Sequence, residues 1–409
     1  MRNDVDCRIC ESRDLLLFLD LGNLPIADAF TDIDHSTDPY SRFPLAVNLC
    51  KQCGWHQLSH VIEPEILYQQ DYPYDSRVTK TGKRHWDSFA YSVASHYGIK
   101  QGDVIVDIGS NTGALLDSFK FFSESVQGVD PSETASEIAR KNNIPTVVSF
   151  FNKDAVHEII ATIGNASVVT ATNSFAHVDD VSAWVENVKL LLSPQGVLII
   201  ESPHVLQLIK NNQFDTIYHE HLSYVSVKPL VEFFKKRGLH IIRVEKTVIH
   251  GGSIRIHVCK NESLVDSSVS EIIKEESQAR ISEIDNLLLF ANRITDLREK
   301  LQNILFDITS RNETIGIVSA PAKGMTLINS LNLSNLNIVG ISDRSHLKIG
   351  KFAPGIGLKV LNDSELLSLE PNYLLILAWN FAEEIIGNIQ TMSNKKNKYI
   401  VPIPDPVIY

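Results

Sequence analysis

Four ionisable side chains stand next to one another in the middle of the chain: Tyr218, His219, Glu220 and His221. Each buried polar group needs its own hydrogen-bond partner, so such a run is a costly way to fill a core. The run follows the apolar segment Gly196 to Glu201, which has the pattern of a strand. Ligands of open α/β sheets bind beyond the carboxyl ends of strands. The sequence therefore predicts a proton-transfer site here, with a solvated surface loop as the alternative.

A second histidine is expected at the same edge of the sheet. His177 ends the segment NSFAH, which begins at Asn173 and follows the apolar run Ser167 to Ala171. A single histidine in such a segment is more often structural than catalytic. Its place after a neighbouring strand nevertheless aims it at the same crevice as the first cluster. The two segments together are predicted to form one acid–base site.

A glycine turn upstream predicts a bound cofactor. The segment Val104 to Gly113, VIVDIGSNTG, is a buried-strand pattern that ends in Asp107 and leads into a helical run. Such a turn lets the backbone approach a ligand and aims helix N–H groups at it. Asp130 lies about twenty residues on, at the end of the next predicted strand, where it can accept hydrogen bonds from ribose hydroxyls. This spacing indicates an adenosine-containing cofactor, with an unliganded glycine turn as the alternative.

The composition of the loop favours S-adenosylmethionine over a dinucleotide. NAD would use the same acidic residue, but a pyrophosphate is expected to bring the order G-x-G-x-x-G rather than G-S-N-T-G. S-adenosylmethionine is a sulfonium compound without a phosphate, so it does not need a loop that binds phosphate. The residues expected to hold it are Asp107, Gly109, Ser110, Asn111, Gly113, Asp130, Phe151 and Asn173.

Four of the five cysteines form two C-x-x-C pairs near the N-terminus. They are Cys7 with Cys10 and Cys50 with Cys53, and Gly54 suits the tight turn after the second pair. Two such pairs supply the four thiolates of a tetrahedral Zn²⁺ site, and four protein ligands leave no open position for catalysis. We therefore expect structural zinc, with disulfides or unligated thiols as the alternative.

The elements that must position these residues fall into three parts. Residues 1 to about 70 contain many turn-forming residues and little periodicity, so this segment is expected to be loop-rich and stapled by the metal. From about 71 to 262, apolar strand patterns alternate with helical patterns, which predicts a doubly wound, Rossmann-like α/β sheet. Residues 263–310 have the pattern of a charged amphipathic helical connector. Residues 311–409 repeat a smaller α/β pattern.

This last part offers two cations to an anionic ligand. Lys323 lies after a predicted strand, beside Gly324 at a helix start, and Arg344 follows the next predicted strand. A helix N-terminus and a nearby cation suit a diphosphate. Either residue could instead be an ordinary surface charge. The segment Ala320 to Gly324, APAKG, matches neither a dinucleotide fingerprint nor a P-loop.

Ordered motifs across nearly the whole chain resemble the sugar C-methyltransferase family, typified by enzymes that make branched deoxysugars such as tetronitrose. The motifs are the C-x-x-C pairs, DIGSN-x-G, GVDPS, N-x-FAH, YHEH, HGGS-x-R (His250 to Arg255), APAKG and LAWN (Leu377 to Asn380). The resemblance implies a zinc-binding N-terminal domain, a central cofactor domain and a C-terminal Rossmann-like domain that helps to hold a sugar nucleotide.

The resemblance also assigns roles to single residues. It places Tyr72, His177, Tyr218, Glu220 and His221 at active-site positions, with His221 as the base. The candidate substrate contacts are Lys323, Arg344, His219 and Arg255. Two departures affect the cofactor and nucleotide contacts: Thr112 stands where the family often has Asp, and Met325 where Asn is common.

The reaction expected from these residues is methylation of carbon. A carbon beside a ketone becomes a nucleophile when a base removes its proton, so a nucleotide-linked 4-keto-6-deoxy sugar would react at C3. His221 would take that proton, which contributes about 10²- to 10⁴-fold in rate. Donors such as Tyr218, Tyr72 or His177 would stabilise the enolate oxygen. The alternatives are an O- or N-methyltransferase and a non-catalytic, zinc-containing adaptor that binds nucleotide sugars.

Composition limits the partners. The 409 residues carry a formal net charge of −11, which disfavours nucleic acid as a ligand because phosphate binding needs clustered Lys and Arg. The N-terminal segment has no apolar signal core, and the apolar runs are short, so neither secretion nor membrane spanning is expected. Cysteine pairs that favour a metal over disulfides suit a reducing compartment. We expect a cytoplasmic monomer.

Overall fold

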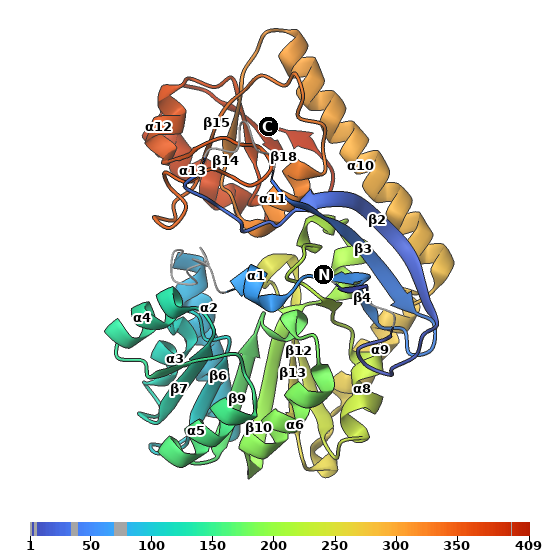
Figure 1. The fold of residues 1–409 in the computed structure, drawn as a ribbon, viewed down its shortest axis with the longest axis vertical. Helices are drawn as coiled ribbons and strands as arrows, with labels where there is room; N and C mark the ends of the chain where they lie inside the picture. The colour runs from blue at the N-terminus through green and yellow to red at the C-terminus, as the bar shows by residue number, and fades with distance from the viewer. Residues whose placement is uncertain (1, 4–5, 34–39, 69–79, 394) are drawn as a thin grey trace.

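The computed structural model describes residues 2–3, 6–33, 40–68, 80–393 and 395–409. Tyr72, predicted at the active site, lies outside the described residues. Figure 1 shows two α/β units, one above the other, with a long pair of strands and a long helix running along one side. The predicted α/β class, with an N-terminal part and two α/β parts, is confirmed.

The lower unit is built on a seven-stranded sheet with the order β12-β13-β10-β9-β6-β7-β8. Its strands are β6 (Ile105–Ile108), β7 (Val126–Asp130), β8 (Thr146–Val148), β9 (Ala166–Thr172), β10 (Leu192–Pro203), β12 (His240–Thr247) and β13 (Ser253–Cys259). The strands from β8 to β10 pair in parallel, whereas β13 is antiparallel to both β10 and β12. The parallel strands therefore end at one common edge, where the sequence predicts the site.

Helices cover both faces of this sheet, as the near-continuous apolar strands require. Successive residues of β6 point to opposite sides: Ile105 packs with one cluster of helices and Val106 with another. The helices around the sheet are α2 (Lys80–Tyr97), α3 (Ala114–Phe119), α4 (Glu133–Lys141), α5 (Lys153–Ile163), α6 (Val181–Leu191), α7 (Val205–Lys210) and α8 (Val227–Lys235). Side-chain caps define several starts, as at α4, where Ser132 accepts from Ala135 N.

The N-terminal part is more regular than the sequence suggests. It forms a four-stranded sheet with the order β11-β4-β3-β2 rather than the expected loops. The strands are β2 (Leu15–Pro25), β3 (Arg42–Cys50), β4 (His56–Leu58) and β11 (Ser223–Tyr224). The strand β11 comes from the segment just after His221, so the loop that carries the YHEH run is joined to this sheet. A short pair, β1 (Arg2–Asn3) and β5 (His60–Val61), and helix α1 (Pro64–Tyr68) complete this part.

The upper unit is built on a six-stranded sheet with the order β16-β15-β14-β17-β18-β19. Its strands are β14 (Ile315–Val318), β15 (Ile338–Ser342), β16 (Val360–Leu361), β17 (Tyr373–Ile376), β18 (Lys398–Val401) and β19 (Val407–Ile408). Its helices are α11 (Ala322–Asn329), α12 (Asp363–Ser368) and α13 (Ala382–Met392). All pairs are parallel except the last, which confirms the second, smaller α/β pattern.

The connector between the two units is helical, as predicted, and consists of α9 (Ser267–Gln278) and α10 (Ile284–Ser310). The buried face of α10 repeats at helical spacing: Leu287, Phe290, Ile294, Leu297, Leu301, Leu305 and Ile308. This stripe packs in one apolar cluster with β2, β14 and residues on either side of the YHEH run. The long helix therefore joins the N-terminal sheet to the upper unit (Figure 1).

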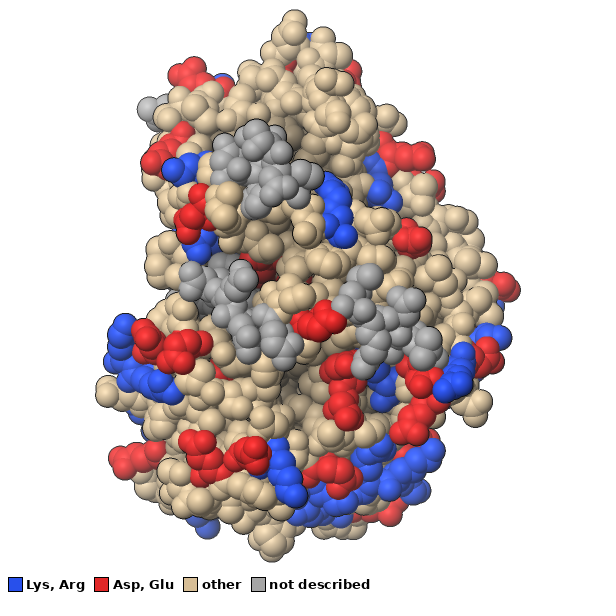
Figure 2. Space-filling view, viewed as in Figure 1, with Lys and Arg blue, Asp and Glu red and all other residues tan. Residues whose placement is uncertain are grey.

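The surface carries charges of both signs. On the face in Figure 2, Lys and Arg side chains lie among Asp and Glu side chains, mostly over the lower part of the molecule, and other residues cover much of the rest. Within the described parts of the chain, none of the helices has the length and apolar character needed to cross a bilayer.

Candidate active site and cysteine cluster

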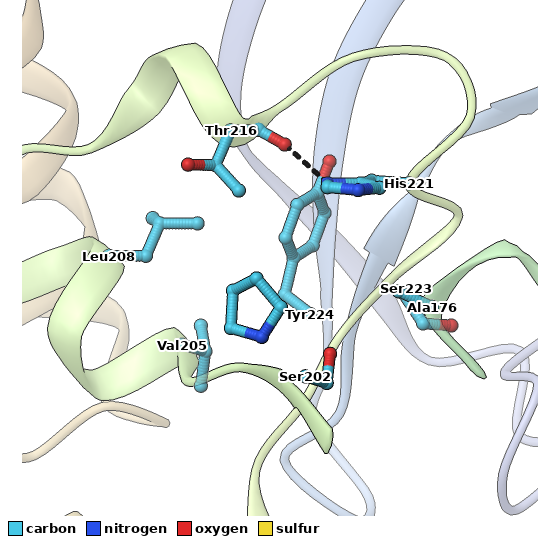
Figure 3. Close-up of a pocket in the computed structure, with 9 residues that line it drawn as sticks. Ala176, Ser202, Val205, Leu208, Thr216, His221, Ser223 and Tyr224 are labelled. Atoms are coloured by element: carbon cyan, nitrogen blue, oxygen red, sulfur yellow. Dashed lines mark hydrogen bonds between the residues drawn. The ribbon is translucent and has the colours of Figure 1, made fainter. Parts of the chain in front are cut away.

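A small pocket lies at the carboxyl edge of the central sheet, between the end of β10 and the loop before β11 (Figure 3). It is lined by Ala176, Ser202, Pro203, Val205, Leu208, Thr216, His221, Ser223 and Tyr224. His221 is the imidazole in this lining, and Ala176 is the neighbour of His177 in the short helix η1 (Phe175–His177). The pocket therefore lies where both predicted histidine segments converge.

One hydrogen bond fixes which nitrogen of His221 carries the proton. Its Nδ1 donates to the carbonyl oxygen of Thr216 at 2.8 Å (Figure 3). A carbonyl only accepts, so this bond assigns the proton to Nδ1 and leaves the lone pair on Nε2. Burial, followed by the neighbouring His177, holds the pKa of His221 well below its usual range. The result is a buried, neutral imidazole that is arranged to accept a proton.

Two further predicted residues lie against this imidazole. The ring centroid of Tyr218 is 3.9 Å from that of His221, and the centroid of His177 is 5.1 Å away. Burial lowers the pKa of His177 to about 4, so this ring is also neutral near pH 7. The structure thus brings together three groups that lie on two separate loops in the sequence.

Of the YHEH run, His221 lines this pocket, whereas Tyr218, His219 and Glu220 do not. Glu220 is buried, and burial followed by the nearby Asp28 carboxylate raises its pKa to about 8. His219 turns toward the N-terminal sheet: its Nε2 donates to the carbonyl oxygen of Phe43 at 3.2 Å, and its ring packs edge-on against the Phe43 ring. The predicted substrate contact of His219 remains a prediction.

His250 lies near His221 and Asn173. In the sequence it stood out only as the first residue of the HGGS-x-R motif. Its Nε2 accepts a hydrogen bond from Asn173 Nδ2 at 3.3 Å, and burial lowers its pKa to about 4. Its φ of 55° is a left-handed conformation that non-glycine residues rarely adopt. The run of His250 with Gly251 and Gly252 was the available signal, because two adjacent glycines often accompany such a turn.

The glycine turn after β6 has the geometry of a cofactor cradle. Gly109 has φ 72°, and a Cβ built there would lie 2.6 Å from the Cβ of Ser174, so the backbone needs glycine. Asp130 accepts hydrogen bonds from the backbone N–H groups of Asn111 at 2.8 Å and Ser132 at 2.9 Å. Its carboxylate is thus fixed at the end of β7, with further lone pairs left for a ligand.

Other polar groups at this cradle fit a bound nucleoside. Ser110 is buried, and its hydroxyl has no hydrogen-bond partner among the described residues. The Asp107 carboxylate accepts from the Thr170 hydroxyl at 2.6 Å, and burial raises the pKa of Asp107 to about 7. Asn173 and Phe151 follow β9 and β8, at the same edge of the sheet. The predicted cofactor residues therefore follow neighbouring strands at one edge of the sheet, and their contact with a cofactor remains a prediction.

The four N-terminal cysteines form one cluster. Their sulfur atoms all lie within 4.8 Å of one another, and the contacts between the two pairs are 3.6 Å from Cys7 to Cys53 and 3.5 Å from Cys10 to Cys50. These thiols are free. Sulfurs bound to one Zn²⁺ at about 2.3 Å would be separated by about 3.8 Å, so the cluster fits a tetrahedral ion. Cys259 lies apart in β13, as expected of a core residue.

Arg255, a predicted substrate contact, is engaged within the protein. Its Nε donates to the buried Glu201 carboxylate at 2.7 Å, and its guanidinium lies 3.9 Å from the ring centroid of Phe89. The other Glu201 oxygen is 2.6 Å from His85 Nε2. This network ties the start of α2 to the end of β10. A direct contact of Arg255 with substrate remains a prediction.

The upper unit contributes a lysine close to the pocket. Lys323, at the start of α11, lies with its Nζ 4.7 Å from the ring centroid of Trp379. The Trp379 Nε1 donates to the buried Asp215 carboxylate at 2.6 Å, in the short helix η2 (Phe214–Thr216). Arg344 is farther out, half-exposed, and paired with Asp363 at 3.0 Å. Asp215 and Trp379 were not predicted as site residues, although Trp379 is part of the LAWN motif.

Three family models match successive parts of the chain. They are described as "Putative zinc binding domain" over residues 7–68, "Methyltransferase domain" over residues 87–244, and "C-methyltransferase C-terminal domain" over residues 248–404. The first covers the four clustered cysteines, and the second covers the glycine turn and the YHEH run.

Individual proteins extend these matches. The C-methyltransferase NovU of Streptomyces niveus is 32% identical over 403 residues, which are 98% of this chain and 96% of that protein. A ubiquinone biosynthesis O-methyltransferase of Chelativorans sp. is 27% identical over 117 residues, 27% of this chain and 46% of that protein. Among solved structures, a magnesium protoporphyrin IX methyltransferase from Synechocystis has a TM-score of 0.36 and 16% identity, covering 46% of this chain and 90% of that one.

Proposed function

Because the chain belongs to the C-methyltransferase family, as a methyltransferase that uses S-adenosylmethionine and carries an N-terminal zinc-binding domain, we propose that it methylates a nucleotide-linked 4-keto-6-deoxy sugar at C3. The observation that carries the proposal is the tautomer of His221. A base for a carbon-bound proton must present an unprotonated nitrogen in a site that excludes water, and the bond from Nδ1 to Thr216 leaves Nε2 in that state.

The proton steps follow from the residues around the pocket. His221 Nε2 removes the proton from the carbon beside the ketone, and the electron pair of that bond moves onto the ketone oxygen. Tyr218 and His177 lie within ring-contact distance of His221 and are the described donors that can stabilise the oxygen as its charge grows. Tyr72 is proposed as a further donor, and Glu220 as the group that orients the sugar or the base.

The cofactor is proposed to occupy the cradle at the carboxyl edge of the sheet. Gly109 and Gly113 allow close approach of the backbone, Asp130 holds the ribose hydroxyls, and Asn173 connects this side to the histidine cluster through His250. When bound, S-adenosylmethionine supplies an electrophilic methyl group on sulfur. The protein holds the two reactants in line, and this alignment is a major part of such catalysis.

The nucleotide is proposed to lie toward the upper unit. Lys323 is a buried cation whose charge acts on His221, and a charge-assisted contact with a diphosphate would compete with its present position over Trp379. Arg344 is proposed as a second cation, and His219 and Arg255 as further substrate contacts. The formal net charge of −11 supports a small anion held by a few local cations rather than a nucleic acid.

A panel of substrates tests the proposal. We expect mass spectrometry to show the gain of one methyl group on at least one dTDP-, GDP-, UDP- or CDP-linked 4-keto-6-deoxy sugar incubated with cofactor. In D₂O without cofactor, the same sugar should exchange the hydrogen beside the ketone for deuterium. The matched control is the sugar reduced at C4, which has no acidified proton. Methylation of that reduced sugar would contradict carbon methylation and indicate an O-methyltransferase.

A further inference from the structure

Arg8 stands between two zinc ligands in the sequence, yet its side chain points away from them. The residue lies in the first C-x-x-C turn, between Cys7 and Cys10, and its backbone N–H donates to the Gln57 side chain at 2.9 Å. Its side chain is only 3% exposed. A guanidinium buried to this degree needs defined partners, because removing its charge from water is costly.

Those partners lie on the two loops that carry the histidines. Arg8 Nη1 donates to the carbonyl oxygen of Leu222 at 3.1 Å, and Leu222 directly follows His221. Arg8 Nε is 3.4 Å from the Asp179 carboxylate, and Asp179 stands two residues after His177. One side chain of the zinc-binding part therefore contacts both catalytic segments.

Backbone hydrogen bonds also join the zinc-binding part to the loop of His221, but not to the loop of His177 in the N-terminal sheet. Leu58 N donates to Leu222 O at 3.0 Å, so β4 and β11 continue the N-terminal sheet into the end of the catalytic loop. Trp55, just after the second cysteine pair, donates from Nε1 to the Ser223 hydroxyl at 3.3 Å. The segment of His177 is not a strand of this sheet, so the zinc-binding part reaches that segment through side chains, among them Arg8.

We propose that Arg8 is a positioning residue that sets the distance between His177 and His221 by holding Leu222 and Asp179 from the zinc-binding turn. This inference rests on the proposed function, because both rings act on the substrate in that reaction. The two rings lie 5.1 Å apart. A misplacement of about 1 Å in a catalytic group can cost about 10²-fold in rate, so a fixed spacing between the rings has a direct effect on turnover.

Four variants of the full-length protein test the role of Arg8. Arg8→Met removes the charge and donors while keeping most of the stem, and Arg8→Lys keeps a cation that can reach one partner. Asp179→Asn removes the ion pair without touching the zinc turn. Arg13→Met is the matched control, because Arg13 is exposed, lies near the same turn and pairs with Asp6 rather than with either catalytic loop. Each is assayed with the panel sugar that the wild type methylates, together with zinc content.

We expect kcat of Arg8→Met to fall about 10²-fold, with KM within about threefold and zinc retained. Arg8→Lys should recover part of that loss, and Arg13→Met should match the wild type. A kcat for Arg8→Met within twofold of Arg13→Met would overturn the inference. If Arg8→Met loses zinc, Asp179→Asn decides: a fall of kcat with zinc retained supports the inference, and wild-type turnover overturns it.

A spectroscopic readout separates this inference from the proposed function. Ring signals of ¹⁵N-labelled His177 and His221, assigned with His177→Asn and His221→Asn, should shift in Arg8→Met and not in Arg13→Met. Unchanged signals would overturn the positioning role even if no panel sugar is methylated. Methylation failure in the wild type would instead count against the proposed function alone.

Discussion

At the scale of single residues, the proposed role of His221 as the base depends on the bond between its Nδ1 and Thr216, which leaves the lone pair on Nε2. We expect His221→Asn to lower kcat about 10²- to 10⁴-fold, because asparagine can still donate to the carbonyl but offers no base. Binding of S-adenosylmethionine, measured by calorimetry, should not change. The matched control is His157→Asn, on the exposed side of α5. Equal turnover of the two variants would contradict the assignment of the base.

Glu220 is expected to make the stability of the folded protein depend on pH. Burial raises its pKa from an ordinary 4.5 to about 8, so the unfolded chain binds fewer protons than the folded chain between these values. The stabilising contribution of protonated Glu220 is therefore present below pH 4.5 and is lost as the pH rises through 8. The variant Glu220→Gln stays neutral at every pH. Its melting temperature relative to the wild type should rise by several degrees between pH 5 and pH 9.

The control for this experiment is Glu124→Gln, because Glu124 is exposed. Its melting temperature relative to the wild type should be flat over the same range, measured by differential scanning calorimetry. A flat difference for Glu220→Gln as well would show that Glu220 is ionised in the folded protein at neutral pH.

At the scale of elements, the turn between β6 and α3 shows how a backbone conformation limits the cofactor site. Gly109→Ala would place a Cβ 2.6 Å from Ser174 Cβ at a φ of 72°. We expect affinity for S-adenosylmethionine to fall at least about tenfold, since about 1.4 kcal/mol of misfit suffices. Gly102→Ala is the matched control, because Gly102 also has a positive φ but open space around it. Equal affinities in calorimetry would contradict the close approach at Gly109.

The same scale shows what sequence patterns could predict. The sequence predicted β6, β7, β9 and β10 close to their observed positions. Buried parallel strands are easy to recognise because they form continuous apolar runs. The long strand β2 was missed. Its pairing with β3 shifts register between Leu17 and Leu19 and again between Asp20 and Asn23, so the alternation that identifies a strand is interrupted. Its apolar side chains also pack against α10, far along the chain.

At the scale of the whole molecule, one apolar cluster joins the N-terminal sheet, the long helix α10, the segment around the YHEH run and the upper unit. It contains β2, the buried stripe of α10, helix η2 and the upper sheet. Motifs and spacing predicted which segments bear chemistry, but not that Arg8 of the zinc turn contacts Asp179, nor that Trp379 contacts Asp215. Such contacts join residues more than 160 positions apart and leave no local pattern.

The hydrogen bond from Trp379 to Asp215 joins the upper unit to the segment before the YHEH run, and its removal can be tested. Trp379→Phe keeps a ring near Lys323 and Gly251 but removes the donor, which leaves the buried Asp215 carboxylate without that bond. Losing such a bond costs about 1–3 kcal/mol. The free energy of unfolding should fall by that amount, and KM for the nucleotide sugar should rise, because Lys323 and the catalytic loop lose their common support. Cofactor affinity should stay constant.

A double-mutant cycle separates this contact from a general packing defect. Asp215→Asn removes the charge that depends on the indole donor, so the two substitutions should not be additive in denaturant unfolding or in KM. We expect a coupling energy above about 0.5 kcal/mol, as for residues in direct contact. Additivity within about 0.3 kcal/mol would mean that the indole acts only by filling space. Burial raises the pKa of Asp215 to about 6, whereas the Lys323 charge and then the indole donor act to lower it. With additive effects, the upper unit would act on the segment before His221 through the apolar cluster rather than through this bond.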